Sequence, residues 1–181
     1  GSVLIFAQTT TYVDALYNIL GEIYSGDVTR YHSRIKPERR KKQLLFDFLQ
    51  GKRKIMIATS AFSMGIDVPD IELVVHFNAP ISMTDYIQQI GRAGRDGRKA
   101  HCILFYDRSG DDEAISNSFI KKAKKQSPKA AKTIKSNLNQ VHNFIHSDSC
   151  MVCDILEYQG QDETKTCKRC TVCAQKRRNN K

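Results

Sequence analysis

Short, unbroken apolar runs alternate with helix-like segments over roughly the first hundred residues of the chain. None of these runs shows a strict apolar–polar alternation, and strands buried on both faces of a sheet have this character. The segments between them carry apolar residues at helical spacing. We therefore expect an α/β domain over residues 1–107, with a parallel sheet covered by helices on both faces. The expected strands are 3–8, 28–32, 54–59, 73–78 and 101–107.

Local start and stop signals place the helices between these strands. A helix over 37–51 would have Pro37 in its first turn and end at Gly51. A helix over 83–90 would begin after Ser82, with Asp85 three residues later in a capping-box arrangement. A third helix is expected over 11–24, from its apolar spacing.

The pattern changes near residue 109. Two helices are expected, over 111–125 and 131–146, separated by the sequence QSPKA, and a cysteine-rich segment begins at Cys150. Charge follows the same division: residues 1–120 carry 15 Lys/Arg against 14 Asp/Glu, and residues 121–181 carry 14 against 5. A neutral body with a basic end favours an acidic polymer as partner, most often nucleic acid. The alternative is that the basic runs are simply solvated.

The overall composition indicates a soluble, intracellular protein. Apolar residues make up 40% of the chain, enough for one sizeable core. No apolar run approaches the roughly 18–20 residues that cross a bilayer, so no membrane partner is expected. The first residues also lack the layout of a signal peptide.

Three cysteines stand at C-x-x-C spacing, Cys167, Cys170 and Cys173, and thiols so spaced bind one metal ion. Tetrahedral zinc needs a fourth ligand, for which Cys150 and Cys153 both compete. A disulfide framework is disfavoured in an intracellular chain.

Several other metal-ligating or nucleophilic residues are assigned structural roles. Cys102 is expected to be buried in the last strand as a small apolar residue. His142 and His146 stand at i, i+4 on an expected helix and are interpreted as surface or packing residues, while His76 is interpreted as a core histidine.

Residues 91–97, GRAGRDG, combine two arginines with three glycines. Arginine presents a fixed positive charge and a planar fork that suits phosphate oxygens, and glycine permits tight turns and close approach. Ligands of open α/β sheets collect at the carboxyl ends of the strands, and we expect the arginines at one edge of such a site. The chain contains no G-x-x-x-x-G-K-[ST] phosphate loop, so the residues predict half of a nucleotide site.

The segment ATSAFSMGIDVPDIELVVHFNAP (58–80), followed by YIQQIGRAGRDG (86–97), resembles the second motor lobe of superfamily 2 helicases. The opening glutamine, Gln88, with AFSMGID and FYD, is similar to the RecQ family of DNA helicases, over residues 2 to 175. The resemblance implies a RecA-like lobe over 1–108, a small helical zinc-binding subdomain over 109–175 and a basic tail over 176–181.

The resemblance also implies roles for single residues. Arg95 resembles the arginine finger that reaches the ATP γ-phosphate, with Arg92 as its companion and Gln88 opening the motif. The remaining positions are Gly65 and Asp67 near the nucleotide, and Tyr31, His32 and Thr59 beside the DNA. Two residues depart from the family pattern: Arg34 stands where a glycine is common, and Gln89 where many members carry glutamate.

For the metal, the family's C-x16-C-x2-C-x2-C spacing favours Cys150 with Cys167, Cys170 and Cys173 as ligands of one structural Zn²⁺, which leaves Cys153 as an extra thiol.

The expected function is therefore the C-terminal half of the motor core of a 3′→5′ ATP-dependent DNA helicase. ATP and Mg²⁺ would be bound by the whole enzyme together with an N-terminal RecA-like lobe, and this chain alone would be inactive. Single-stranded DNA and duplex junctions would be its partners, in a bacterial cytoplasm rather than a nucleus. Two alternatives remain: a standalone zinc-dependent nucleic-acid-binding module, and an RNA helicase lobe of the same superfamily.

Overall fold

A computed structural model describes residues 1–63, 71–107, 110–162 and 165–179. The sheet region and the helical region follow one another along the chain. The sheet region comprises β1 (Ser2–Phe6), α1 (Thr10–Ile23), β2 (Val28–Tyr31), α2 (Glu38–Leu49), β3 (Ile55–Ala58), β4 (Ile71–His76), α3 (Met83–Ile90) and β5 (His101–Leu104). The helical region comprises α4 (Asp111–Lys124), α5 (Pro128–Ile145), α6 (Met151–Tyr158) and α7 (Thr171–Asn179).

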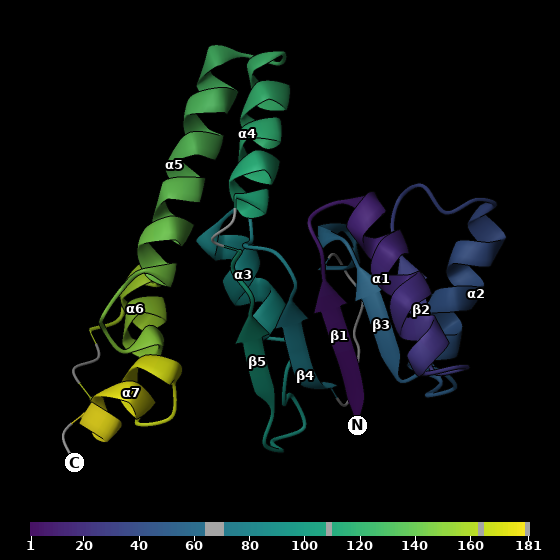
Figure 1. Ribbon diagram of the computed structural model, residues 1–181, viewed down its shortest axis with the longest axis horizontal. Helices are drawn as coiled ribbons and strands as arrows, with labels where there is room; N and C mark the ends of the chain where they lie inside the picture. Colours follow the sequence, from purple (N-terminus) through teal and green to yellow (C-terminus); the bar gives the residue numbers. More distant parts are fainter. Residues whose placement is uncertain (64–70, 108–109, 163–164, 180–181) are drawn as a thin grey trace.

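The five strands form one parallel sheet in the order β2-β3-β1-β4-β5. The predicted RecA-like α/β fold with helices on both faces is confirmed. Figure 1 shows the strands side by side, with α1 and α2 lying over the half of the sheet that contains β2 and β3. Because all strands run the same way, their carboxyl ends meet at a single edge of the sheet, which positions the loops that follow them.

Each face of the sheet packs against a different helix. Leu4 and Met56 lie on one face, and α2 contributes Phe48 to the same cluster. Ile57 lies on the other face, where α1 contributes Val13. All five of these side chains are 0–2% exposed. Alternate residues of one strand therefore pack against α2 and against α1, which explains why the strand sequences are apolar throughout.

A third apolar cluster joins the helical region to the sheet region. Met83 and Tyr86 of α3 pack against Val141 and Phe144 of α5, and Ile155 of α6 lies against the same cluster. The α4–α5 pair extends away from the sheet as an antiparallel hairpin, while α6 and α7 lie near the opposite end of α5 (Figure 1). None of the described helices is long and apolar enough to cross a membrane.

Two features differ from the sequence-based expectations. Cys102 is exposed rather than buried, because β5 is the last strand of the sheet and His101, Cys102 and Ile103 are uncovered. The cysteine-rich segment contains two helices that its composition does not indicate, α6 and α7.

Candidate functional sites

The arginine-containing loop begins where α3 ends, with Gly91 as the C-cap. The N–H of Gly94 donates to the carbonyl of Ile71, the first residue of β4, at 3.0 Å, and Ala93 forms a bridge with the same residue. The loop therefore lies at the amino ends of the strands and not at the carboxyl-end edge expected from the sequence. The reason is geometric: α3 starts beyond the carboxyl end of β4 and returns along the sheet to its other end.

Two of the three glycines have a backbone conformation that requires glycine. Gly94 has φ +65°, and a Cβ built there would lie 2.8 Å from the carbonyl oxygen of Arg98. Gly97 has φ +80° with open space around it. Gly91 has the ordinary φ of −65°. The turn of the loop thus depends on Gly94 above all, where both the dihedral angle and the close approach exclude a side chain.

The two arginines of the loop differ in their exposure. Arg92 is 5% exposed. Arg95 is exposed, and its Nε donates to the carbonyl oxygen of Gly91 at 3.1 Å, which holds the side chain beside the end of α3. Gln88, one turn before Arg92, is exposed as well. Arg95 and Gln88 therefore lie at the surface, whereas Arg92 lies within the fold.

A buried pair of polar side chains, His76 and Gln89, joins β4 to α3 just before the arginine-containing loop. His76 Nε2 and Gln89 Oε1 lie 2.8 Å apart, and the two side chains are 0% and 3% exposed. Burial lowers the pKa of His76 to about 4, and the Gln89 bond opposes the shift. The imidazole is consequently neutral at pH 7. His76 is a core histidine, as interpreted from the sequence, but its partner Gln89 was noted only as a family departure.

Tyr31 and Thr59 lie together at the carboxyl ends of β2 and β3. The N–H of Thr59 donates to the carbonyl of Tyr31 at 3.3 Å. The Tyr31 ring packs edge-on against Phe62, with centroids 5.5 Å apart, and the Lys41 amine lies 5.4 Å from its centroid. Both residues are half-buried. The structure thus brings together two of the three residues assigned to DNA, at the opposite end of the sheet from the arginines.

His32 follows directly, but its ring is used inside the fold. It is 3% exposed, its Nε2 lies 3.0 Å from Asp14 Oδ1, and its Nδ1 accepts the N–H of Arg34 at 3.2 Å. Because Nδ1 accepts, Nε2 carries the proton and donates to Asp14. The ring therefore orders the loop from His32 to Arg34, and only backbone atoms of this residue remain to contact a ligand. Gly65 and Asp67 lie outside the described residues.

Four cysteines converge at the start of α6 and before and within α7. The sulfurs of Cys150, Cys167, Cys170 and Cys173 all lie within 4.8 Å of one another, and those of Cys150 and Cys170 are 4.0 Å apart. Sulfurs around tetrahedral zinc, at Zn–S distances near 2.3 Å, stand about 3.8 Å apart. The donor set and its spacing therefore fit one Zn²⁺ with no open position.

Backbone N–H groups prepare the thiols for this role. Cys167 N donates to Cys150 Sγ at 3.2 Å, and Cys170 N donates to Cys167 Sγ at 3.3 Å. Burial of Cys150 opposes its ionisation, but the bonds from the backbone N–H groups of Cys167, Cys153 and Val152 outweigh it and lower the pKa of Cys150 to about 6. Burial and the neighbouring thiols raise the pKa of Cys173 to about 12. Four clustered thiols thus do not all ionise without a cation, and a bound divalent ion supplies the charge that stabilises the thiolates.

The local backbone explains how Cys167 and Cys170 reach the same point. Lys168 between them has φ +59°, a left-handed conformation that turns the chain back on itself. Cys153 lies one helical turn after Cys150 but outside the cluster, and its Sγ donates to the carbonyl of Lys165 at 3.5 Å. Of the two candidates for the fourth ligand, the structure groups Cys150 with the other three.

The α4–α5 hairpin carries the basic surface. From residue 114 to residue 147 the sequence contains no acidic residue. All lysines of this stretch are exposed: Lys121, Lys122, Lys124, Lys125, Lys129, Lys132 and Lys135. Such a surface attracts phosphate groups with a marked salt dependence. His142 and His146 lie on the same helix with ring centroids 4.3 Å apart, both exposed, beside Tyr106.

Comparison with known proteins defines the class. The model of the helicase conserved C-terminal domain matches residues 1–97, and the RecQ zinc-binding model matches residues 110–174. In fold, the chain is similar to the DEAD-box protein Dbp5 of S. cerevisiae bound to RNA and ADP BeF3, with a TM-score of 0.53 and 27% identity over 76% of this chain and 38% of that one. The α/β part is thus a RecA-like helicase C-terminal lobe.

Sequence relatives specify the family. ATP-dependent DNA helicase RecQ of Bacillus subtilis is 32% identical over 96% of this chain and 28% of its own length. A protein of Acanthamoeba polyphaga mimivirus named “Putative ATP-dependent RNA helicase” is 33% identical over 95% of this chain and 30% of its own length. With the two matching models, these relatives place the chain in the RecQ family, as its C-terminal helicase region. The chain spans less than a third of the length of these relatives.

Proposed function

We propose that this chain is the second motor lobe and zinc-binding subdomain of a RecQ-like 3′→5′ ATP-dependent DNA helicase. The lobe would comprise residues 1–108, the zinc-binding subdomain 109–175, and a basic tail 176–181. A separate N-terminal lobe of the same protein would supply the phosphate loop and the Mg²⁺ ligands, since this sequence has no phosphate loop. The two lobes would close on ATP and reopen after its hydrolysis.

In this proposal Arg95 is the arginine finger. Its exposed guanidinium, beside the end of α3, is able to reach a nucleotide held by another lobe and to stabilise charge on the γ-phosphate oxygens. Arg92, which is buried, would couple that contact to the lobe interior, and Gln88 would approach the same ligand. Gly65 and Asp67 would complete the nucleotide side.

The proposed DNA contacts lie at the other end of the sheet. Tyr31 and Thr59, joined by a backbone hydrogen bond, would contact the DNA backbone. His32 would act by holding its loop through Asp14 and Arg34, since its ring is buried. One lobe would thus present a nucleotide end and a DNA end, so that movement of the lobe shifts both together.

The zinc cluster and the lysine-rich hairpin complete the proposal. A structural Zn²⁺ held by four thiolates leaves no open position for catalysis, so its role is to fix α6 and α7 against α5. The exposed lysines of α4 and α5 would bind phosphates at a junction between single-stranded and duplex DNA.

One observation carries the proposal: a helicase C-terminal lobe and a RecQ-type four-cysteine cluster occur in the same chain, packed through α3 and α5. The test uses a longer protein that contains residues 1–181 together with its phosphate-loop lobe. Arg95→Ala should lower the rate of DNA-stimulated ATP hydrolysis by at least about 10³-fold, with nucleotide binding retained.

Arg98→Ala is the matched control, because Arg98 is an exposed arginine of the same loop whose Nε donates to Asp96. It should leave the hydrolysis rate within about two-fold of the parent. Equal activity of the Arg95→Ala protein and its parent would refute the finger. The chain of residues 1–181 alone should show no ATP hydrolysis and no unwinding.

An RNA helicase lobe is the second candidate, favoured by the name of the mimivirus relative. Competition of forked DNA against RNA of the same sequence, with the longer protein, separates the two. Preference for DNA supports the RecQ-like function, and preference for RNA replaces it. A longer protein without any phosphate loop would favour a standalone nucleic-acid-binding module.

A further inference from the structure

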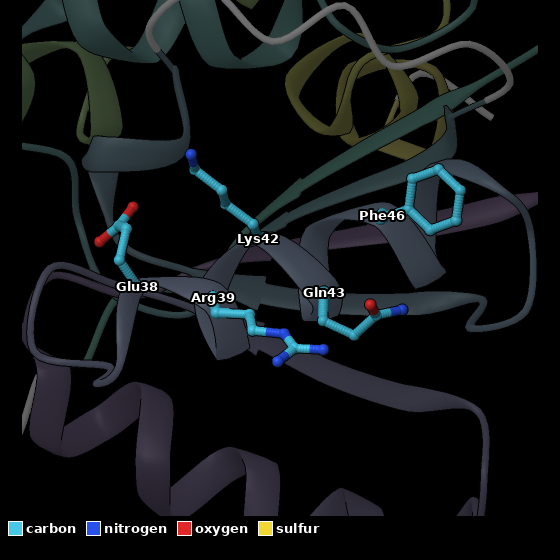
Figure 2. A pocket seen from close by; sticks show the side chains of 5 residues that line it. All are labelled: Glu38, Arg39, Lys42, Gln43 and Phe46. Atoms are coloured by element: carbon cyan, nitrogen blue, oxygen red, sulfur yellow. The ribbon is translucent and has the colours of Figure 1, made fainter.

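The outward face of α2 carries side chains that the proposed function does not use. We call the surface formed by Arg39, Lys42, Gln43 and Phe46 the α2 face. With Glu38 these residues line a shallow hollow of about 500 Å³ (Figure 2). Arg39, Gln43 and Phe46 are spaced i, i+4 and i+7, which places them in one line along the helix, and Lys42 flanks them.

Phe46 is half exposed, at 50%, in the middle of basic residues. Its ring is not part of the core, which α2 reaches through Leu45, Phe48 and Leu49. The Lys52 amine lies 5.8 Å from its centroid. A single exposed aromatic residue is common, but an exposed ring in line with a guanidinium and an amide offers stacking and polar contacts on one surface.

The charge of this surface is strongly positive. Residues 36–42 read KPERRKK, five cations against one carboxylate. Glu38 accepts Lys41 at 2.9 Å, so this acidic side chain is already paired. In the described part of the chain neither Arg39 nor Lys42 makes an ion pair. Their charges are therefore available to an anionic ligand.

The α2 face is continuous with the proposed DNA end of the lobe. α2 begins just beyond the carboxyl end of β2, where Tyr31 lies. Lys41, in the first turn of α2, contacts the Tyr31 ring on one side and Glu38 on the other. From Arg39 to Phe46 the helix rises about 10 Å. A strand that leaves Tyr31 and Thr59 near the start of α2 would therefore follow this helix towards Phe46.

We propose that the α2 face binds a short segment of single-stranded DNA beyond the contacts at Tyr31 and Thr59, an inference that rests on the proposed function. Arg39 and Lys42 hold phosphates, and the Phe46 ring stacks on an unpaired base. The Oε1 of Gln43, whose Nε2 donates to Asp47 Oδ1 at 2.9 Å, contacts the same nucleotide. Stacking requires a base that is out of a duplex, which is why the ligand is a single strand. The hairpin of α4 and α5, with its seven exposed lysines, is suited to duplex phosphates instead.

The first test measures the affinity of zinc-loaded residues 1–181 for fluorescein-labelled oligothymidylate over a range of salt concentrations. Phe46→Ala should weaken binding about ten-fold, and Phe46→Tyr should restore it, because one stacked base contributes on this scale. Arg39→Gln and Lys42→Gln should each lower the slope of log affinity against log salt by about 0.7.

Lys54→Gln is the charge-matched control: Lys54 is exposed, lies outside the hollow at the amino end of β3, and should leave the slope unchanged. Equal binding by Phe46→Ala and the parent would overturn the inference. The inference would also be overturned if a polyglutamate peptide displaced the DNA to the same extent from Phe46→Ala and from the parent. The α2 face would then be a general surface for acidic ligands.

A second test locates the strand directly. An oligothymidylate that contains 5-iodouracil is photo-crosslinked to the chain, which is then digested with trypsin. We expect crosslinks in the peptide of residues 43–52, at Phe46, and in the peptide of residues 31–34, at Tyr31. A crosslink at Tyr31 alone would overturn the inference and leave the proposed DNA end intact. Absence of crosslinks from both peptides would refute both.

Discussion

The sheet region and the segment from α6 to α7 are stabilised in different ways. The sheet region buries Leu4, Met56, Ile57 and Phe62 completely, between helices on both faces. Within α6 no residue is fully buried, and α7 buries only Cys173. One region thus has an apolar core of its own, whereas the other has a cluster of four thiols where a core would be.

This difference indicates which part of the chain depends on metal. Removal of apolar surface from water stabilises the sheet whether or not zinc is bound. For α6 and α7 the binding free energy of the ion serves as folding free energy, as in other small metal-dependent modules. The helical hairpin stands between the two, since Val141 and Phe144 of α5 pack against α3.

The largest effect is expected from loss of the metal. Cys150 is the N-cap of α6 and one of the four clustered thiols. Cys150→Ser removes this ligand, and the zinc content should fall from one ion per chain to none. The free energy lost is on the order of 10 kcal/mol. Hydrogen exchange followed by mass spectrometry should show loss of protection over α6 and α7, with β1, β3 and β4 still protected.

Cys153→Ser is the matched control, a cysteine three residues away and outside the cluster. It should keep one zinc and the protection pattern of the parent. If Cys150→Ser retains the metal, or if the sheet loses protection together with α6, the division into an apolar and a metal-dependent region is wrong.

The second effect addresses the apolar core. Leu4 is 0% exposed in the cluster shared with α2. Leu4→Ala should lower the free energy of unfolding by about 3–5 kcal/mol, from lost transfer energy and the cavity left behind. The change is measured by urea unfolding of the zinc-loaded chain.

Ile19→Ala on α1 removes an apolar side chain that is 57% exposed, and it should change stability by less than about 0.5 kcal/mol. A similar loss in both variants would show that the sheet region is not close-packed at Leu4. Zinc content should stay at one per chain in either case.

The sheet region and the segment from α6 to α7 also differ in how well the sequence predicts them. The strands and α3 were located within a few residues, because apolar runs and the Ser82–Asp85 cap are local signals. The exposure of Cys102 was not foreseen, because edge position depends on the order of strands in space. α6 and α7 were not located individually, because α6 is apolar but only eight residues long and α7 is short and mostly polar.

The sites show the same limits. The choice of Cys150 over Cys153 came from family spacing, and spacing alone left both open. The burial of His32 depends on Asp14, eighteen residues earlier on α1, a contact that no local pattern indicates. The arginine loop was expected at the wrong end of the sheet, because the general rule for ligand sites does not consider that α3 runs back to the amino end of β4.

The third effect tests the buried histidine that lies near the joint between the regions. His76 stacks on Phe6 and lies against Tyr86, which in turn packs on Phe144 of α5. Its folded pKa of about 4 is below the ordinary value of 6.5. The unfolded chain therefore binds a proton first as pH falls, so stability is highest above about pH 6.5 and decreases towards pH 4, by about 3 kcal/mol in total.

His76→Gln removes this titration, and urea unfolding at a series of pH values measures the difference between parent and variant. The parent should lose more stability on acidification than the variant, by up to about 3 kcal/mol. Acid also protonates the zinc ligands, but equally in both proteins, so the difference isolates His76. Parallel pH profiles would show that the imidazole is not held neutral.

The smallest effect is expected from loss of a serine N-cap, of which α3 in the sheet region and α5 in the helical region each have one. Ser82 Oγ accepts the N–H of Asp85 at 3.0 Å at the start of α3, and Ser127 Oγ accepts the N–H of Ala130 at 3.1 Å at the start of α5. Each serine-to-alanine substitution should cost about 1 kcal/mol, because one N–H at the helix start loses its acceptor. Urea unfolding of the zinc-loaded chain measures both.

Because α5 packs against α3 through Phe144 and Tyr86, we expect both caps to shift the same unfolding transition. Ser118→Ala, an exposed position within α4, serves as the control and should shift it by less than about 0.5 kcal/mol. If Ser127→Ala leaves the transition of the sheet unchanged while Ser82→Ala moves it, the hairpin unfolds on its own. The boundary between core-dependent and metal-dependent structure would then lie before α4 and not before α6.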